Sequence, residues 1–287
     1  MADPEKSSLA VVGAGVMGTG ITTLAAGSGL RVVLVDNDQA ALDKARHTIA
    51  FQLRHARMMG ALPADTEPGE VVTTTSVDDL SGVDTVVEAI FEHKDTKAKV
   101  LTEVANVVGE DATLITNTSG IPVDELADLL PQPGQLVGTH FMNPAYLIDL
   151  VEVVQGRHTS AATVAGLRTL LGRLNRRAVV VRDSPGFVTS RLLHPMLNDA
   201  ARLVGEQVAT AEDVDALMVG CLGHRTGPLR TADLIGLDNL ADSLVALYER
   251  TGEQRYLPCD QLLAKVRDGD LGYKSGSGFY QYRETLS

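Results

Sequence analysis

The sequence predicts an α/β protein in which a domain with a mostly parallel sheet is followed by an all-α domain. Short β-branched runs alternate with helical patterns through the first two-thirds of the chain, a glycine-rich motif follows the first run, and no convincing strand follows residue 186. Alternating strands and helices are typical of βαβ units and parallel sheets. The length of 287 residues also suits two domains.

The N-terminal domain is expected to span residues 1–183. Its predicted strands are 8–12, 31–35, 71–74, 85–88, 113–116, 136–140, 150–154 and 178–181. Between them, helical patterns occupy 16–28, 39–59, 95–108, 123–130 and 161–174. Such βαβ repetition places the carboxyl ends of the parallel strands along one edge, where ligands bind in open α/β sheets.

The C-terminal domain is expected to span residues 184–287, because Pro185 and Gly186 punctuate a change of composition. Its predicted helices are 187–204, 211–222, 233–250 and 258–267. The uncharged stretch 7–30 imitates a membrane span. Since it is rich in Gly, Thr and Ser, we interpret it as strand, turn and helix.

Charge and composition exclude several classes of partner. Lys and Arg number 25 and Asp and Glu number 37, giving a net charge of −12, which argues against nucleic acid and anionic membrane. Cys221 and Cys259 match no metal or redox spacing. Both are expected to be reduced and buried, as in a cytoplasmic protein, and no metal is expected.

The glycine-rich motif indicates a dinucleotide site. In G-x-G-x-x-G the first glycine permits a tight turn, the second admits a pyrophosphate to the backbone, and the third brings helix and sheet together. A carboxylate at the end of the next strand can accept both ribose hydroxyls of NAD and repel the 2′-phosphate of NADP. A mere turn with a capping Asp is the less favoured alternative. The predicted NAD-binding residues of this Rossmann-like segment are Gly13, Gly15, Val16, Met17, Gly18 and Asp36.

A histidine and a carboxylate stand out in two apolar strands. His140 ends one predicted strand, and Glu152 interrupts the next. A buried Glu needs a cationic or hydrogen-bonding partner, and a Glu-oriented imidazole is a competent general base. A lone His there would more often be structural. Asn117 and Ser119 follow another strand, and for them ordinary turn chemistry is an equally good interpretation.

Taken together, these motifs resemble the 3-hydroxyacyl-CoA dehydrogenase family, including short-chain 3-hydroxybutyryl-CoA dehydrogenases. The residues that carry the resemblance are 13–18, 87–89, 117–119, 140–144, 150–153, 183–187, 227–229, 232–238 and 274–280. It implies a Rossmann-like domain, a helical domain that dimerises, and NAD-dependent oxidation or reduction at C3 of a hydroxyacyl thioester. Homodimers are therefore expected.

The resemblance also implies residue roles. His140 resembles the general base, Glu152 its orienting carboxylate, and Ser119 the hydroxyl that binds the reacting oxygen. The positions that match the nicotinamide half of the family's cofactor site are Glu92, Lys97, Asn117 and Asn143.

Three departures from the family pattern concern the substrate. Ser190 replaces a family Asn, Gly120 replaces a Ser, and Ala50 and Arg54 stand where short-chain relatives carry CoA-binding lysines. We retain Ser190 as a catalytic and substrate-binding candidate and Arg54 as a substrate-binding one. The expected substrate is a short-chain acyl-CoA. The alternative is a hydroxyacyl group such as glyceryl on an acyl carrier protein, as for similar dehydrogenases that make polyketide extender units. The basic cluster Lys44, Arg46, Arg54 and Arg57 could meet either, or be a solvated helix face. A non-catalytic dinucleotide-binding relative is the remaining alternative.

Overall fold

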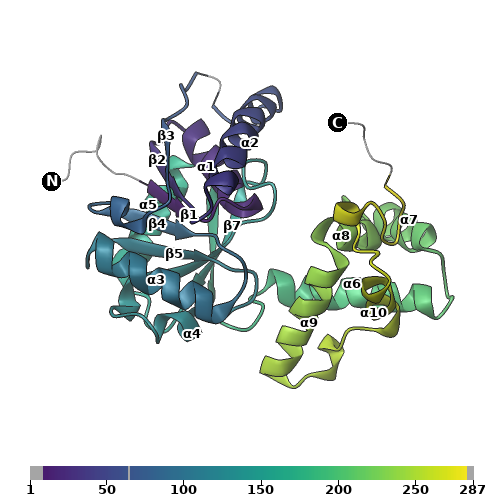
Figure 1. Cartoon of the computed structure of the whole chain (residues 1–287). Coiled ribbons are helices and arrows are strands. Elements are labelled where there is room, and N and C mark those ends of the chain that lie inside the picture. Colours follow the sequence, from purple (N-terminus) through teal and green to yellow (C-terminus); the bar gives the residue numbers. More distant parts are fainter. Residues whose placement is uncertain (1–8, 64, 283–287) are drawn as a thin grey trace. The chain divides into compact units, whose positions relative to one another are not determined.

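A computed structural model of the chain describes residues 9–63 and 65–282. The chain forms two compact units that divide between Phe187 and Val188. The first contains one sheet with helices on both faces, and the described part of the second is helical apart from isolated bridges near its end (Figure 1). The predicted fold class, a mostly parallel α/β domain followed by an all-α domain, is confirmed.

The first unit is built on an eight-stranded sheet of order β3-β2-β1-β4-β5-β6-β7-β8. All neighbouring strands are parallel except β6 and β7. The strands are β1 (Leu9–Val12), β2 (Val32–Val35), β3 (Val71–Thr74), β4 (Thr85–Glu88), β5 (Thr113–Asn117), β6 (Leu136–His140), β7 (Leu150–Gln155) and β8 (Arg177–Arg182). The helices of this unit are α1 (Val16–Gly27), α2 (Gln39–Met58), α3 (Lys94–Val108), α4 (Val123–Ala127) and α5 (Ala161–Arg173), with 3₁₀ turns η1 (Val77–Leu80) and η2 (Pro133–Gln135).

Alternation along the strands produces two cores, one on each face of the sheet. Val11 and Leu34 point into a core with side chains of α1, α2 and α5. Val12 and Val35 point into the other core, with side chains of α3 and α4. Because side chains of a strand alternate between faces, strands buried on both faces are apolar throughout, as the sequence shows.

The strand order brings the ends of the six parallel strands β1 to β6 to one edge of the sheet. The order reverses between β1 and β4, the point where open α/β sheets bind their ligands. β7 runs antiparallel to β6, so the beginning of β7 lies at the same edge. The sheet topology therefore places the turns that follow six strands beside the first residues of β7.

The second unit contains α6 (Thr189–Gly205), α7 (Ala211–Leu222), α8 (Pro228–Ile235), α9 (Leu237–Thr251) and α10 (Asp260–Arg267), with 3₁₀ turns η3 (Gln254–Tyr256) and η4 (Tyr273–Ser275). The predicted single helix 233–250 is wrong. Gly236 has a φ of +97° and separates α8 from α9. A helix cannot continue through that backbone conformation, which glycine adopts without the steric cost of a side chain.

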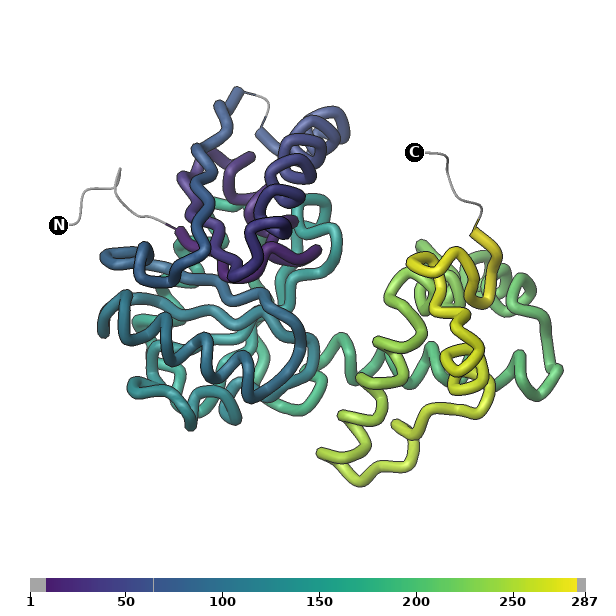
Figure 2. Tube along the Cα trace, viewed as in Figure 1, coloured from purple at the N-terminus to yellow at the C-terminus, as the bar shows by residue number. Residues whose placement is uncertain are grey.

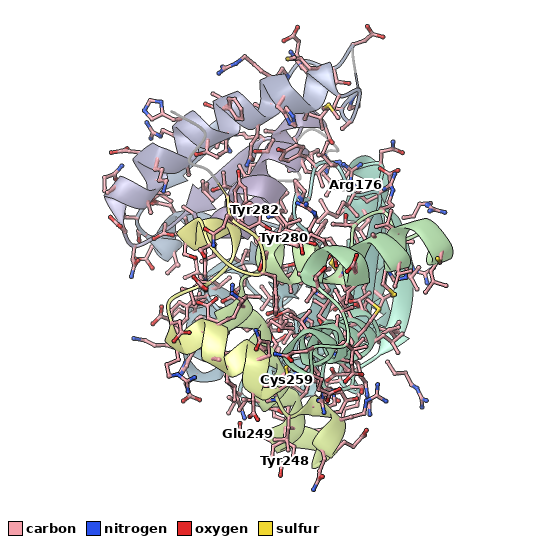
Figure 3. The ribbon with its side chains drawn as sticks, turned by 90° about the vertical axis from the view of Figure 1, so that its right-hand side faces the viewer. Arg176, Tyr248, Glu249, Cys259, Tyr280 and Tyr282 are labelled. Atoms are coloured by element: carbon pink, nitrogen blue, oxygen red, sulfur yellow. The ribbon has the colours of Figure 1, made fainter. Side chains whose placement is uncertain are left out.

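The end of the described chain is held by two buried carboxylates, Asp233 on α8 and Asp215 on α7. Asp233 accepts hydrogen bonds from the amides of Phe279 (2.9 Å) and Tyr280 (3.0 Å) and from the Tyr282 hydroxyl (3.0 Å). Asp215 accepts the Tyr280 hydroxyl at 2.9 Å. Figure 2 shows this C-terminal segment in yellow running back over the helices, and Figure 3 labels the two tyrosines.

The two cysteines differ in burial. Cys259 is buried, which raises the pKa of its thiol, whereas Cys221 is exposed, so the expectation that both are buried is wrong. Cys221 lies in the last turn of α7, which is exposed, whereas Val214 and Asp215 earlier in the helix are buried.

Among the described residues no helix is both long and apolar enough to cross a membrane. The uncharged stretch contains β1 and α1, and its first two residues lie outside the described part.

Candidate active site

The glycine motif forms the turn between β1 and α1. Gly13 has a φ of +107°, and a Cβ there would lie 2.7 Å from the carbonyl oxygen of Ala89. A Cβ on Gly18 would collide with the carbonyl oxygen of Gly13. By contrast, nothing lies within 4 Å of the place where Gly15 would carry its Cβ, so that side of the turn is open.

This turn has the features that a dinucleotide needs. Gly15 is the N-cap of α1 and makes no side-chain hydrogen bond to the positive end of the helix, which suits an anion there. Asp36, directly after β2, accepts hydrogen bonds from the amides of Ala14 (2.7 Å) and Asp38 (3.0 Å). Val16 is 69% exposed beside the turn, and Met17 is partly buried. The residues present therefore fit the pyrophosphate and adenosine ribose of NAD.

His140 and Glu152 face each other across two neighbouring strands. The antiparallel register of β6 and β7 pairs the two residues, and His140 Nδ1 lies 3.1 Å from Glu152 Oε2. The side chains are 12% and 4% exposed. The ring of Phe187 meets the His140 ring edge-on at 6.1 Å. The sequence-predicted pair is thus a hydrogen-bonded dyad of a partly buried His140 and a buried Glu152, at the ligand edge of the sheet.

Glu92 organises the turn that follows β5. Its Oε1 accepts hydrogen bonds from the Thr118 hydroxyl (2.5 Å), the Ser119 amide (2.9 Å), the Gly120 amide (3.2 Å) and the Ser119 hydroxyl (3.3 Å). The Glu92 side chain is 38% exposed. This carboxylate therefore fixes the backbone around Ser119, beside the ends of β4 and β5.

A buried ion pair that the sequence reasoning did not single out lies behind this turn. Glu88 ends β4, and its Oε1 is 2.7 Å from Lys97 Nζ, with both side chains fully buried. Burial raises the pKa of Glu88, and the Lys97 ammonium opposes that effect. The available signal was the one used for Glu152, a single carboxylate in an apolar strand, here Val86-Val87-Glu88.

The other predicted site residues lie in several different elements. Asn117 ends β5, where its Oδ1 accepts the Phe141 amide at 3.1 Å, and Asn143 is exposed before a cis Pro144. Ser190 is buried in α6 of the second unit. Arg54 is exposed on α2.

The basic cluster on α2 is partly engaged within the chain. Arg46 donates to the Thr73 hydroxyl at 3.1 Å, and Arg57 donates to the Thr66 carbonyl at 2.8 Å. Within residues 9–63 and 65–282, no group of three or more His, Cys, Asp or Glu side chains could hold a metal ion.

Comparison with known proteins agrees with this geometry. A family model of the 3-hydroxyacyl-CoA dehydrogenase NAD binding domain matches residues 8–184, and a model of that enzyme's C-terminal domain matches residues 186–282. The chain belongs to the 3-hydroxyacyl-CoA dehydrogenase family. The predicted family and its NAD-binding domain are thereby confirmed.

Individual relatives span nearly the whole length. A probable 3-hydroxybutyryl-CoA dehydrogenase of Deinococcus radiodurans is 39% identical over 274 residues, covering 95% of this chain and 99% of the relative. The crystal structure of FadB2 from M. tuberculosis matches with a TM-score of 0.92 at 37% identity, covering 96% of this chain and 99% of that one. The (S)-3-hydroxybutyryl-CoA dehydrogenase PaaH1 from Ralstonia eutropha matches with a TM-score of 0.88 at 36% identity, covering 97% and 99%.

Proposed function

We propose that the chain is an NAD-dependent dehydrogenase that interconverts a 3-hydroxyacyl thioester and its 3-oxoacyl form, with a short-chain acyl-CoA as substrate. The observation that carries this proposal is the hydrogen-bonded His140–Glu152 dyad, at the sheet edge that also holds the glycine turn. The relatives at 36–39% identity whose names give an activity are 3-hydroxybutyryl-CoA dehydrogenases, which supports the short chain.

The dyad supplies acid–base chemistry. Glu152 accepts a hydrogen bond from the Nδ1–H group of His140, which leaves Nε2 as the nitrogen that gains and loses a proton. In the oxidative direction Nε2 takes the proton of the C3 hydroxyl, and Glu152 stabilises the imidazolium that forms. Bound NAD supplies the hydride acceptor. Ser119 binds the reacting oxygen from the turn that Glu92 holds in place.

The dyad is tested by replacing His140 with Ala. Wild-type protein should oxidise NADH in the presence of acetoacetyl-CoA, and His140→Ala should lose about 10²-fold or more of this activity because the general base is gone. The dissociation constant for NADH, measured by fluorescence, should stay within about threefold, since His140 lies outside the glycine turn. Retained turnover in the variant would remove the mechanism.

A carrier-bound hydroxyacyl group is the second candidate substrate. It is favoured by the departures at Gly120 and Ser190 and by exposed Arg54 on a basic helix that could meet an acidic carrier protein. Turnover of acetoacetyl-CoA and of a hydroxyacyl group on acyl carrier protein should be compared at equal concentration. Efficient acetoacetyl-CoA reduction would exclude the acyl carrier protein as the preferred carrier of the acyl group. Failure of every thioester would favour the non-catalytic alternative.

We further propose that the chain works as a homodimer in the cytoplasm. Apolar side chains of the second unit are exposed on α7 and α8, including Leu217 (59%), Leu222 (66%) and Leu234 (63%). Exposed apolar surface of this kind marks protein interfaces. Light scattering should give twice the chain mass of 30.5 kDa, and a mass of one chain would refute the dimer. Cell fractionation tests the compartment.

A further inference from the structure

Lys97 is surrounded by acceptors from three different places in the chain. Its Nζ donates to Glu88 Oε1 (2.7 Å), to the carbonyl oxygen of Asn117 (3.1 Å) and to the carbonyl oxygen of Ile90 (3.2 Å). A lysine ammonium has three donors, so these contacts account for all of them. The side chain has no exposed surface. In this arrangement Lys97 presents no donor to a ligand, although the family resemblance implies a cofactor contact.

Asn117 connects Lys97 to the dyad. Its carbonyl oxygen accepts from Lys97, while its side-chain Oδ1 accepts the amide of Phe141, the residue after His140. The neighbouring Thr118 amide donates to the Thr139 carbonyl at 3.2 Å. The ends of β4, β5 and β6 are therefore tied together by one chain of hydrogen bonds that begins at Lys97 and ends beside the base.

We propose that Lys97 is a positioning residue for the proposed reaction, holding the main chain of Asn117 so that the Asn117 side chain fixes the strand end that carries His140. This inference rests on the proposed function for its kinetic consequence. Its structural consequence, protection of the Phe141 amide, is independent of what the protein catalyses.

Glu88 has a separable role. Its carboxylate neutralises the Lys97 charge and also accepts the Thr116 hydroxyl (2.6 Å) and the Ile90 amide (2.8 Å). In Glu88→Gln the bonds from Lys97 to the Asn117 and Ile90 carbonyls can remain, and Glu92 Oε2 still lies 3.5 Å from the ammonium. In Lys97→Met those bonds disappear and a buried carboxylate is left unpaired, which is strongly destabilising.

Four variants separate positioning from plain structural support: Lys97→Met, Glu88→Gln, the double variant, and Lys99→Met as control. Lys99 lies on the same helix with its side chain 76% exposed. Lys97→Met should lower kcat about tenfold or more, because small displacements of a base are costly, while Glu88→Gln and Lys99→Met stay within about threefold. The KM for the thioester and the NADH dissociation constant should change less than kcat.

If Lys97→Met folds poorly, the double variant decides whether Lys97 positions the base or only stabilises the fold. It contains no unpaired buried charge, so its urea midpoint should recover toward wild type. Its kcat should stay low, and hydrogen exchange at the Phe141 amide should stay faster than in Glu88→Gln. Recovery of kcat together with stability would overturn the positioning role, as would unchanged Phe141 exchange. A raised NADH dissociation constant with normal kcat would overturn it in favour of a cofactor contact. If the wild type turns over no thioester, the proposed function fails, and Phe141 exchange alone decides this inference.

Discussion

In this chain, single carboxylates inside apolar strands are sequence features that indicate residues of the candidate site. Glu152 and Glu88 are each a carboxylate in a run of buried Val residues, and each has a side-chain nitrogen of a buried or partly buried residue within 3.1 Å. Each carboxylate is expected to have a partner, because burying a charge without one costs free energy. The identity of the partner did not follow equally well: His140 lies on the adjacent strand, whereas Lys97 comes from a helix whose register the sequence does not reveal.

Removing the charge of Glu152 should show how much the dyad depends on it. Glu152→Gln keeps the shape but no longer stabilises a protonated imidazole, so kcat should fall about 10²-fold. Steady-state kinetics with acetoacetyl-CoA and NADH measures this. Glu103→Gln, on the surface of α3, is the matched control and should behave as wild type. A Glu152→Gln enzyme with near-normal kcat would mean that the carboxylate only supports the strand.

Asp36 should determine the choice between NAD and NADP. Asp36→Ser removes the carboxylate that accepts ribose hydroxyls and repels a 2′-phosphate, so the ratio of kcat/KM for NAD over NADP should fall about tenfold or more. Asp38→Ser is the control, because Asp38 caps α2 by accepting the Ala40 amide and lies two residues away. Comparable kcat/KM for both cofactors in the wild type would contradict the predicted preference.

At the scale of elements, strands are predicted better than helix ends. The observed strands agree with the predicted ones to within one residue over the described chain, because β-branched runs bounded by turns have few other solutions. α4 ends at Ala127, earlier than predicted, and α8 and α9 were predicted as one helix. Apolar periodicity continues across Gly236, so the break depends on a backbone angle that the pattern does not encode.

Two glycines of the β1–α1 turn should respond differently to the same substitution. Gly18→Ala places a Cβ against the Gly13 carbonyl, so it should lower the melting temperature. Gly15 has a φ of −70° and open space beside it, so Gly15→Ala should melt like the wild type. The added methyl group would nevertheless meet a bound pyrophosphate, and NADH affinity should fall about tenfold or more. Normal NADH binding by Gly15→Ala would contradict the assigned turn.

At the scale of the whole molecule, the two units have separate hydrophobic cores. One core on each face of the sheet stabilises the first unit, and a third core, with Leu229, Leu240 and Tyr256 among its members, stabilises the second. The composition change near residue 185 indicated this division. The position of Ser190 relative to the dyad could not be predicted, since it depends on how two units with their own cores are arranged rather than on any local pattern.

Separate cores imply that alkaline pH should weaken the second unit selectively. Burial and the carboxylates of Asp215 and Asp233 raise the pKa values of Tyr280 and Tyr282 above the ordinary value of a tyrosine. The folded chain therefore keeps protons that the unfolded chain releases, and the free energy of unfolding should fall as pH rises above about 10. Each hydroxyl contributes about 1 kcal/mol through its hydrogen bond below that pH.

Replacing both tyrosines with Phe should remove this alkaline dependence while lowering stability at neutral pH by about 2 kcal/mol, because two hydrogen bonds are lost. Urea unfolding between pH 8 and 11, followed by circular dichroism, measures both effects. Tyr273→Phe is the control, since that ring is 57% exposed. NADH affinity should persist at pH values where the helical signal of the second unit is already lost, because the glycine turn, Asp36 and helices α1 to α5 belong to the first unit. Simultaneous loss of NADH binding and helical signal would show that the two units unfold as one.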